Sequence, residues 1–170
     1  MKGVPVIAVC WALGVVGAAS SSSSALPRCK SGQLRLTGSL QGATQSLLGT
    51  FRLANRTARA CALPVAPRRV SLVIGTQVLP ALTDRMTAGT EPPGTPTRRL
   101  AARGRVSVAV QWRNWCGAPR GNVHLSVRLT IFLRVSPQAA VGLVRTPPCV
   151  DHKYSSRVAV SRFIRATARR

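Results

Sequence analysis

Apolar and polar residues alternate through the segment 123–135. Its odd-numbered positions are all apolar, and its even-numbered positions are polar with the single exception of Phe132. The apolar series is Val123, Leu125, Val127, Leu129, Ile131, Leu133 and Val135. Because successive side chains of a strand point to opposite faces, this period of two predicts one long or bent β-strand with one face in a core.

The same period recurs in shorter segments, separated by turn residues such as Gly75-Thr76. Strands are predicted over 34–36, 47–54, 70–74, 78–79, 106–113 and 158–163. No long window shows the 3.6-residue period of an amphipathic helix. Seven to eight short strands at this spacing predict an all-β fold, an immunoglobulin-like antiparallel β-sandwich. The stretch 83–97, rich in Pro and Gly, is predicted to be a long surface loop.

The N-terminus has the pattern of an export signal. After Met1-Lys2-Gly3 comes a mainly apolar run, 4–19, shorter than the ~20 residues of a spanning helix. This predicts a secretory signal peptide at residues 1–25, with cleavage after Ala25 favoured over cleavage after Ala19 and an uncleaved membrane anchor as the alternative. We therefore expect one disulfide-linked domain at 26–163 and a basic tail at 164–170.

Four cysteines follow the predicted signal peptide: Cys29, Cys61, Cys116 and Cys149. An even number in an exported chain predicts disulfides, and four cysteines allow three pairings. We favour Cys29–Cys61 with Cys116–Cys149, because each bridge then closes a loop of modest length and contributes about 2–4 kcal/mol. A zinc site is disfavoured, since the chain has no C-x-x-C pair and its two histidines lie far apart in sequence.

Two tryptophans, Trp112 and Trp115, precede Cys116, the third of these four cysteines. Alternation places Trp112 on the inner face, where it is expected to pack near the disulfide of Cys116. For Trp115, core packing and an aromatic platform for a sugar or base remain open. Asn55 is expected to form an Asx turn at a strand end, although Asn55-Arg56-Thr57 is formally an N-glycosylation sequon.

The formal net charge is +22, with 25 basic residues against Asp84, Glu91 and Asp151. All but three of the basic residues are arginine. Such an imbalance attracts anionic partners at long range. Candidate anion-binding residues are Arg113, Arg128, Arg134, Arg162 and Arg165, with additions from Arg68, Arg69, Arg98, Arg99, Arg169 and Arg170.

The residues expected of an active site are scarce. Three acids are few for carboxylate chemistry, and His124 falls on the exposed side of its predicted strand. His152 adjoins Asp151, but two sequence neighbours are not a catalytic triad. No nucleophile elbow, phosphate-binding glycine loop or H-E-x-x-H motif occurs. We therefore expect a protein that is not an enzyme and uses neither cofactor nor metal.

The surroundings of the cysteines resemble a known family. Asn55-Arg56-Thr57 leads to Cys61-Ala62-Leu63 and Pro67, Asn114-Trp115-Cys116-Gly117 follows Trp112, and Pro147-Pro148-Cys149 precedes the last strand. This order resembles the secreted actinobacterial family catalogued as domain of unknown function 4232. Val65 departs from the glycine that the family favours. The resemblance implies export, a β-sandwich and a cell-surface or extracellular setting, and it supplies no catalytic residues.

Two functions remain open. The first is a monomeric binding module whose partner is an anionic wall polymer, a phospholipid surface or an acidic protein; nucleic acid is less favoured, because few aromatic residues are available for stacking. The second is a passive envelope component with a protein partner. A single basic face would favour the first function, and an even spread of charge would favour the second.

Overall fold

The computed structural model describes residues 25–43, 45–87 and 89–165, in which strands and one 3₁₀ turn, Ser31–Gln33, are the regular elements. Eight strands have four residues or more: β1 (Leu34–Gly38), β3 (Ser46–Asn55), β5 (Arg69–Ile74), β7 (Leu82–Arg85), β10 (Arg105–Trp115), β11 (Asn122–Thr130), β12 (Gln138–Arg145) and β13 (Ser156–Val160). Six shorter strands are β2 (Gln41–Ala43), β4 (Cys61–Ala62), β6 (Gln77–Leu79), β8 (Thr95–Pro96), β9 (Arg99–Leu100) and β14 (Ile164–Arg165).

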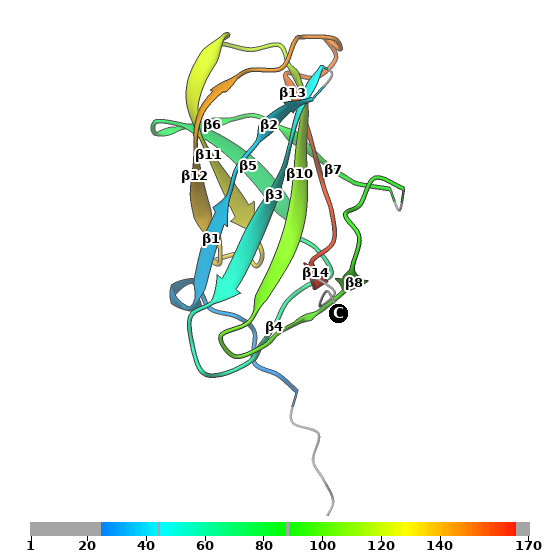
Figure 1. Cartoon of the computed structure of the whole chain (residues 1–170). Helices are drawn as coiled ribbons and strands as arrows, with labels where there is room; N and C mark the ends of the chain where they lie inside the picture. The colour runs from blue at the N-terminus through cyan, green and yellow to red at the C-terminus, as the bar shows by residue number, and fades with distance from the viewer. Residues whose placement is uncertain (1–24, 44, 88, 166–170) are drawn as a thin grey trace, which may run out of the picture.

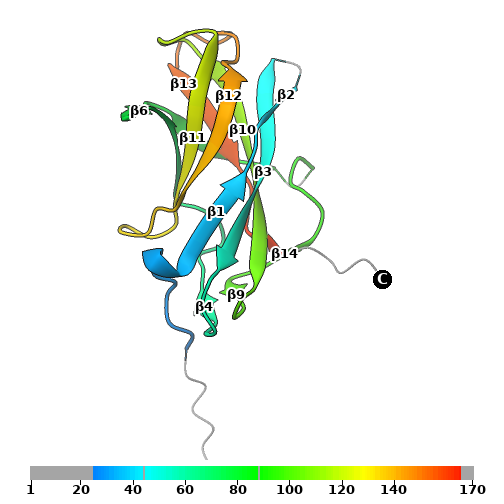
Figure 2. The ribbon, with the colours of Figure 1, turned by 60° about the vertical axis from the view of Figure 1, so that its left-hand side comes forward.

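Two sheets make up the sandwich (Figures 1 and 2). The larger has the order β1-β3-β10-β13-β7, with β2 added to β3 and β14 added to β10; the smaller has the order β12-β11-β5-β6. Among the described strands, only the β13–β7 pairing is parallel. The predicted all-β antiparallel sandwich is confirmed, and a specific relation to immunoglobulin domains stays a prediction.

The core lies between the two sheets and is built from the alternating positions that the sequence indicated. On β10, Val108, Val110 and Trp112 are fully buried, and they face the inner side chains of β3 and β11. Trp112 meets Trp115 edge to face with ring centroids 6.0 Å apart. The Trp112 Nε1 donates to Ser156 Oγ at 2.8 Å. Trp115 is also buried, so the open question about it is answered in favour of core packing.

The segment 123–135 is not one strand throughout, which corrects the prediction. Strand β11 ends at Thr130, and the Ile131 amide donates to the Val135 carbonyl at 2.9 Å across a tight turn. Alternation continues through buried Ile131, but Leu133 lies at the tip of the turn with 85% of its surface exposed. The turn reverses the chain into β12, a strand that the sequence did not predict.

Two further boundaries differ from the prediction. The stretch 83–97 is not wholly a loop, because β7 pairs with β13 and β8 pairs with β14. Met86 is buried against Ala109 and Ala159 as a small second core. The domain also extends past residue 163, since β14 pairs with β10 at Ser107. The predicted signal peptide, apart from Ala25, and the tail beyond Arg165 lie outside the described residues.

Both favoured disulfides are confirmed, Cys29–Cys61 and Cys116–Cys149. Cys29 and Cys61 are buried in the main core. Asn55 forms the expected Asx turn, with its Oδ1 accepting from the Thr57 amide at 3.0 Å. Its Nδ2 donates to the carbonyls of Arg59 and Ala101, so this buried amide is already occupied by the fold.

Buried Asn114 holds the segment that follows Cys149. Its Oδ1 accepts from the amides of Val150 and Asp151, and its Nδ2 donates to the carbonyls of Asp151 and Tyr154.

We expect Asn114→Ala to lower the free energy of unfolding by about 2–3 kcal/mol, because it leaves these backbone groups without partners. Urea unfolding measures this loss. The matched variant Asn122→Ala, at an exposed strand position, should change it by less than about 0.5 kcal/mol. Equal effects of the two variants would contradict the assigned role.

Candidate anion-binding site

The outer face of the smaller sheet carries the arginine groove, defined as Arg69 on β5, Arg128 on β11 and Arg134 in the turn after β11. Strand register creates it: Arg69 lies opposite Thr130, and Arg128 lies opposite Ser71 on one side and Gln138 on the other. Directly opposite residues of antiparallel strands share a face. The inward neighbours Val70, Val127 and Leu129 are buried, so alternation sends these polar side chains outward. Figure 2 shows β11 and β12 side by side on this sheet.

The groove is an open depression of about 640 Å³ with hydroxyl and amide groups between its arginines. It is lined by Ser31, Arg69, Ser71, Val78, Arg128, Thr130, Arg134, Ser136 and Gln138. Not one of these residues is acidic. An anion in the groove would therefore meet hydrogen-bond donors and positive charge without a competing carboxylate.

Two contacts fix polar groups of the groove in place. The Gln138 Oε1 accepts from Arg128 Nε at 3.1 Å and from Arg128 Nη2 at 2.9 Å. This leaves the Nη1 side of the guanidinium for a ligand, since Arg has five N–H donors. The Ser136 hydroxyl donates to Thr130 Oγ1 at 3.3 Å, which leaves the Thr130 hydroxyl hydrogen available to a ligand.

All three acidic side chains of the sequence are engaged elsewhere. Asp84 Oδ2 lies 3.0 Å from Arg157 Nη2, and Asp151 Oδ2 lies 3.9 Å from Arg157 Nη1. Glu91 Oε2 lies 2.6 Å from Arg162 Nη2 and accepts from Arg162 Nε at 2.8 Å. The arginine groove consequently has no internal counter-ion among the acidic side chains.

The structure separates the five predicted anion-binding residues. Arg128 and Arg134 come together in the arginine groove. Arg113 lies on β10 of the other sheet, where its Nε donates to Gln111 Oε1 at 2.9 Å. Arg162 is paired with Glu91, so its guanidinium already has a counter-ion, and its role in anion binding stays a prediction. Arg165 on β14 lines a different depression together with Arg99 and Arg105.

The sequence analysis gives Arg69 only as an addition to the main candidate anion-binding residues, and it does not identify the hydroxyl groups of the groove. Arg69 and Arg128 are 59 positions apart, so their proximity depends on the register between β5 and β11. The available signal was the outward parity of Arg128 in its predicted strand, whereas Arg69 lies one position before the strand predicted over 70–74. That signal gives the face of each strand but not which strands are neighbours.

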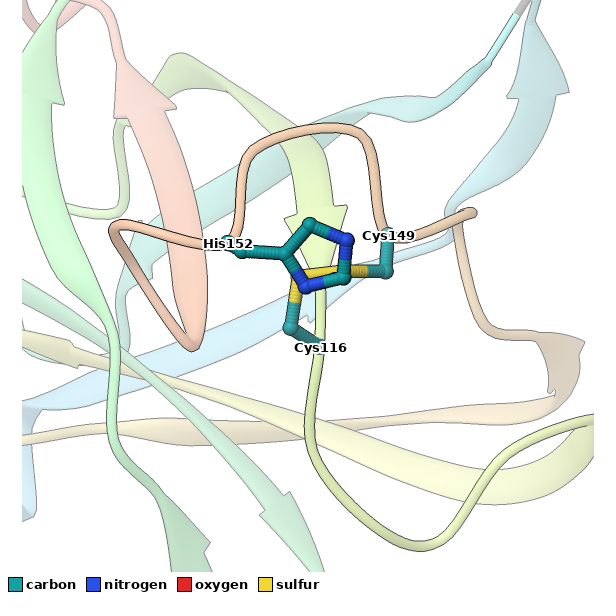
Figure 3. Close-up of side chains that lie close together, drawn as sticks. All are labelled: Cys116, Cys149 and His152. Atoms are coloured by element: carbon teal, nitrogen blue, oxygen red, sulfur yellow. A yellow bond between two sulfur atoms is a disulfide. The ribbon is translucent and has the colours of Figure 1, made fainter.

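His152 lies over the second disulfide (Figure 3). Its Nδ1 and Nε2 are 3.4 Å and 3.7 Å from Cys149 Sγ. Cys116, Cys149 and His152 thus form a group of three potential metal ligands. The spacing Cys149-x-x-His152 indicates such a group, and the sequence analysis did not identify it. Because the two sulfurs are bonded to each other, they are not the thiolates that metals require, so the group is a disulfide with a histidine packed on it.

Comparison with protein families, with curated proteins and with solved structures finds no match to this chain. The resemblance to domain of unknown function 4232 thus stays a prediction. Across 25–43, 45–87 and 89–165, no helix is long and apolar enough to cross a membrane. The two disulfides indicate an oxidising compartment.

The Glu91–Arg162 pair makes a pH dependence expected. Only 8% of the Glu91 side chain is exposed, and its hydrogen bond from Arg162 holds the pKa of the carboxyl below its ordinary value. A carboxyl whose pKa is lowered by folding stabilises the fold above its unfolded pKa of about 4.3, and this stabilisation is lost as the pH falls through the folded pKa.

We therefore expect Glu91→Gln to lower the melting temperature more at pH 7 than at an acidic pH of about 2, because acid removes the stabilisation that the ionised carboxyl provides. Thermal unfolding of both proteins at the two pH values measures the difference. The chain has only three acids and two histidines, so few other groups titrate in this range. A difference between the two proteins that is as large in acid as at pH 7 would refute the assignment.

Proposed function

We propose that this chain is a secreted or cell-envelope β-sandwich without catalytic activity that binds a phosphate-bearing polymer through the arginine groove. The observation that carries the proposal is the convergence of Arg69, Arg128 and Arg134 on one face, with no carboxylate among the residues that line it. Phosphate is the proposed ligand group because the planar guanidinium binds its oxygens in a two-pronged hydrogen bond, as it also does those of a carboxylate.

A polymer is favoured over a compact ligand by the shape of the groove. The depression is shallow and wide, and it extends across β5, β11 and the turn after β11. The hydroxyl groups of Thr130 and Ser136, and of the mostly buried Ser71, lie among the arginines. An extended partner can use all these donors at once, whereas a compact anion would reach only some of them.

Secretion is supported by the signal-peptide pattern at residues 1–25 and by the disulfides, which form in oxidising compartments. Membership of the family catalogued as domain of unknown function 4232 would agree with this location, and we propose it on the cysteine neighbourhoods alone. The absence of catalysis is supported by the placement of the titratable groups. Each acid is in an ion pair, His124 is exposed on β11, and His152 packs on a disulfide.

A phospholipid surface is a second candidate, and one observation favours it. Leu133 is 85% exposed at the tip of the turn that also carries Arg134. Membrane-surface proteins combine such an apolar tip with basic residues. Beside it, however, Phe132 is partly buried against the main core and lies under the Arg28 guanidinium at 5.5 Å. A single exposed leucine offers little apolar area for insertion, so the polymer is preferred.

The test is titration of residues 26–170, with both disulfides formed, against long-chain polyphosphate at several salt concentrations. The double variant Arg128→Gln/Arg134→Gln should weaken binding by about tenfold or more and make the slope of log K against log salt shallower by about two. The matched variant Arg120→Gln/Arg145→Gln removes the same charge from exposed positions outside the groove and should have a smaller effect on both quantities.

Equal losses of polyphosphate affinity in the two double variants would show attraction by net charge alone and would overturn the groove as the site.

Polyglutamate and heparin, matched in charge, distinguish phosphate from carboxylate and sulfate. Vesicles with anionic lipids, tested with Leu133→Ser, distinguish the membrane. If the leucine variant loses vesicle binding and polyphosphate binds no better than the other polyanions, the phospholipid surface replaces the polymer.

A further inference from the structure

A second group of arginines, the arginine triangle, lies on the outer face of the larger sheet. It consists of Arg35 on β1, Arg52 on β3 and Arg105 on β10. Strand register brings the three together: Ala54 of β3 lies opposite Arg35 on one side and opposite Arg105 on the other. Arg52, two positions before Ala54, falls on the same face. Figure 1 shows β1, β3 and β10 as neighbouring strands.

The arginine triangle surrounds a small depression of about 200 Å³, lined by Arg35, Thr37, Arg52, Ala54 and Arg105. Ala54 provides its floor, because a methyl side chain leaves space that a longer one would fill. The Thr37 hydroxyl, opposite Arg52, adds a neutral hydrogen-bonding group. The three arginine side chains are exposed, whereas Leu36, Leu53 and Val106 between them point into the core. This is a cradle of three guanidinium groups around a shallow floor.

No acidic side chain neutralises the arginine triangle, since Asp84, Glu91 and Asp151 pair with Arg157 and Arg162. Three like charges held close together repel one another. Binding of an anion removes this repulsion and adds charge-assisted hydrogen bonds. A phosphate group, with several oxygens available to neighbouring guanidiniums, fits such a cradle.

Other depressions adjoin the strands of the arginine triangle in two directions. Arg105 also lines a larger depression with Arg99 and Arg165. In the other direction, Arg35 follows the turn Ser31–Gln33, whose first residue, Ser31, lines the arginine groove. Strand β1 also contacts β12, so the two sheets approach each other along this edge. Figure 2 shows β1 between β3 and β12 at this edge.

We propose that the arginine triangle is a second phosphate-binding subsite and that one polymer chain occupies it together with the arginine groove. The inference rests on the proposed function and adds the path of the ligand: across β5 and β11, around the β1 edge and onto the larger sheet. Two linked subsites bind a long chain far more tightly than either binds a short anion, because the second contact is intramolecular.

Calorimetric titration with inorganic triphosphate and with long-chain polyphosphate tests the inference on residues 26–170. The wild type should bind two triphosphates per domain and should bind the long chain about a hundredfold more tightly than triphosphate. The triple variant Arg35→Gln/Arg52→Gln/Arg105→Gln should bind one triphosphate and should lose most of the long-chain advantage. Its melting temperature should be equal or higher, because exposed like charges have been removed.

The matched control is Arg85→Gln/Arg120→Gln/Arg145→Gln, which removes three exposed arginines outside both sites and should keep two triphosphates per domain. One triphosphate in the wild type, unchanged by the triangle variant and abolished by Arg128→Gln/Arg134→Gln, would overturn the second subsite and leave the proposed function standing. No saturable triphosphate or polyphosphate binding by the wild type would overturn both. If the wild type, but not the triangle variant, forms cross-linked aggregates with long-chain polyphosphate at low protein concentration, the two sites hold different chains. That result would overturn the single-chain path.

Discussion

Unbalanced positive charge is the constraint to which this fold is adapted. With 25 basic residues against three acids, mutual repulsion opposes the compact state, and the buried core and two disulfides have to compensate for it. The few acids are concentrated where they join distant segments. Asp84 and Glu91, both in 82–97, pair with Arg157 and Arg162 of the C-terminal segment. These ion pairs join the segment 82–97 to β13 and to the segment that follows it, while the other arginines of the described residues have no acidic partner.

Alternation within the strands then decides where the excess charge gathers. The buried positions of the described strands carry no charged residue, so an arginine in a strand points outward, and neighbouring strands place such residues in rows. Arg35 and Arg105 meet around Ala54 in this way, and Arg69 approaches Arg128 for the same reason. The burial of the core and the clustering of arginines are therefore two results of a single pattern. The expected alternatives were one basic face or an even spread, and the structure instead has arginine clusters on the outer faces of both sheets.

The sequence predicted elements with an apolar period, such as β3, β5 and β10, and the disulfide pairing that loop length favoured. It failed for β12, where a bulge opposite Leu125 and Ser126 shifts the parity, and where Gly142 has the positive φ of 98° that favours glycine. It also failed for β7, whose polar residues carry no apolar period. Of the arginine groove, outward parity was predictable. Its assembly was not, because a period of two fixes the face of a strand and says nothing about the strand's neighbours.

Net charge alone cannot make one part of this surface a specific site, because an anion is attracted from a distance by the whole domain. That attraction is screened within about 8 Å at physiological salt. What differs from place to place is how the hydrogen-bond donors of the arginines are held and spaced. Gln138 fixes the Arg128 guanidinium, and Ala54 leaves open the floor between three arginines. Groups held in place lose less conformational entropy on binding than free surface arginines do. Selectivity between anions should therefore persist at salt concentrations where the general attraction has faded, and it should depend most on donors that are held in place, as Arg128 is by Gln138.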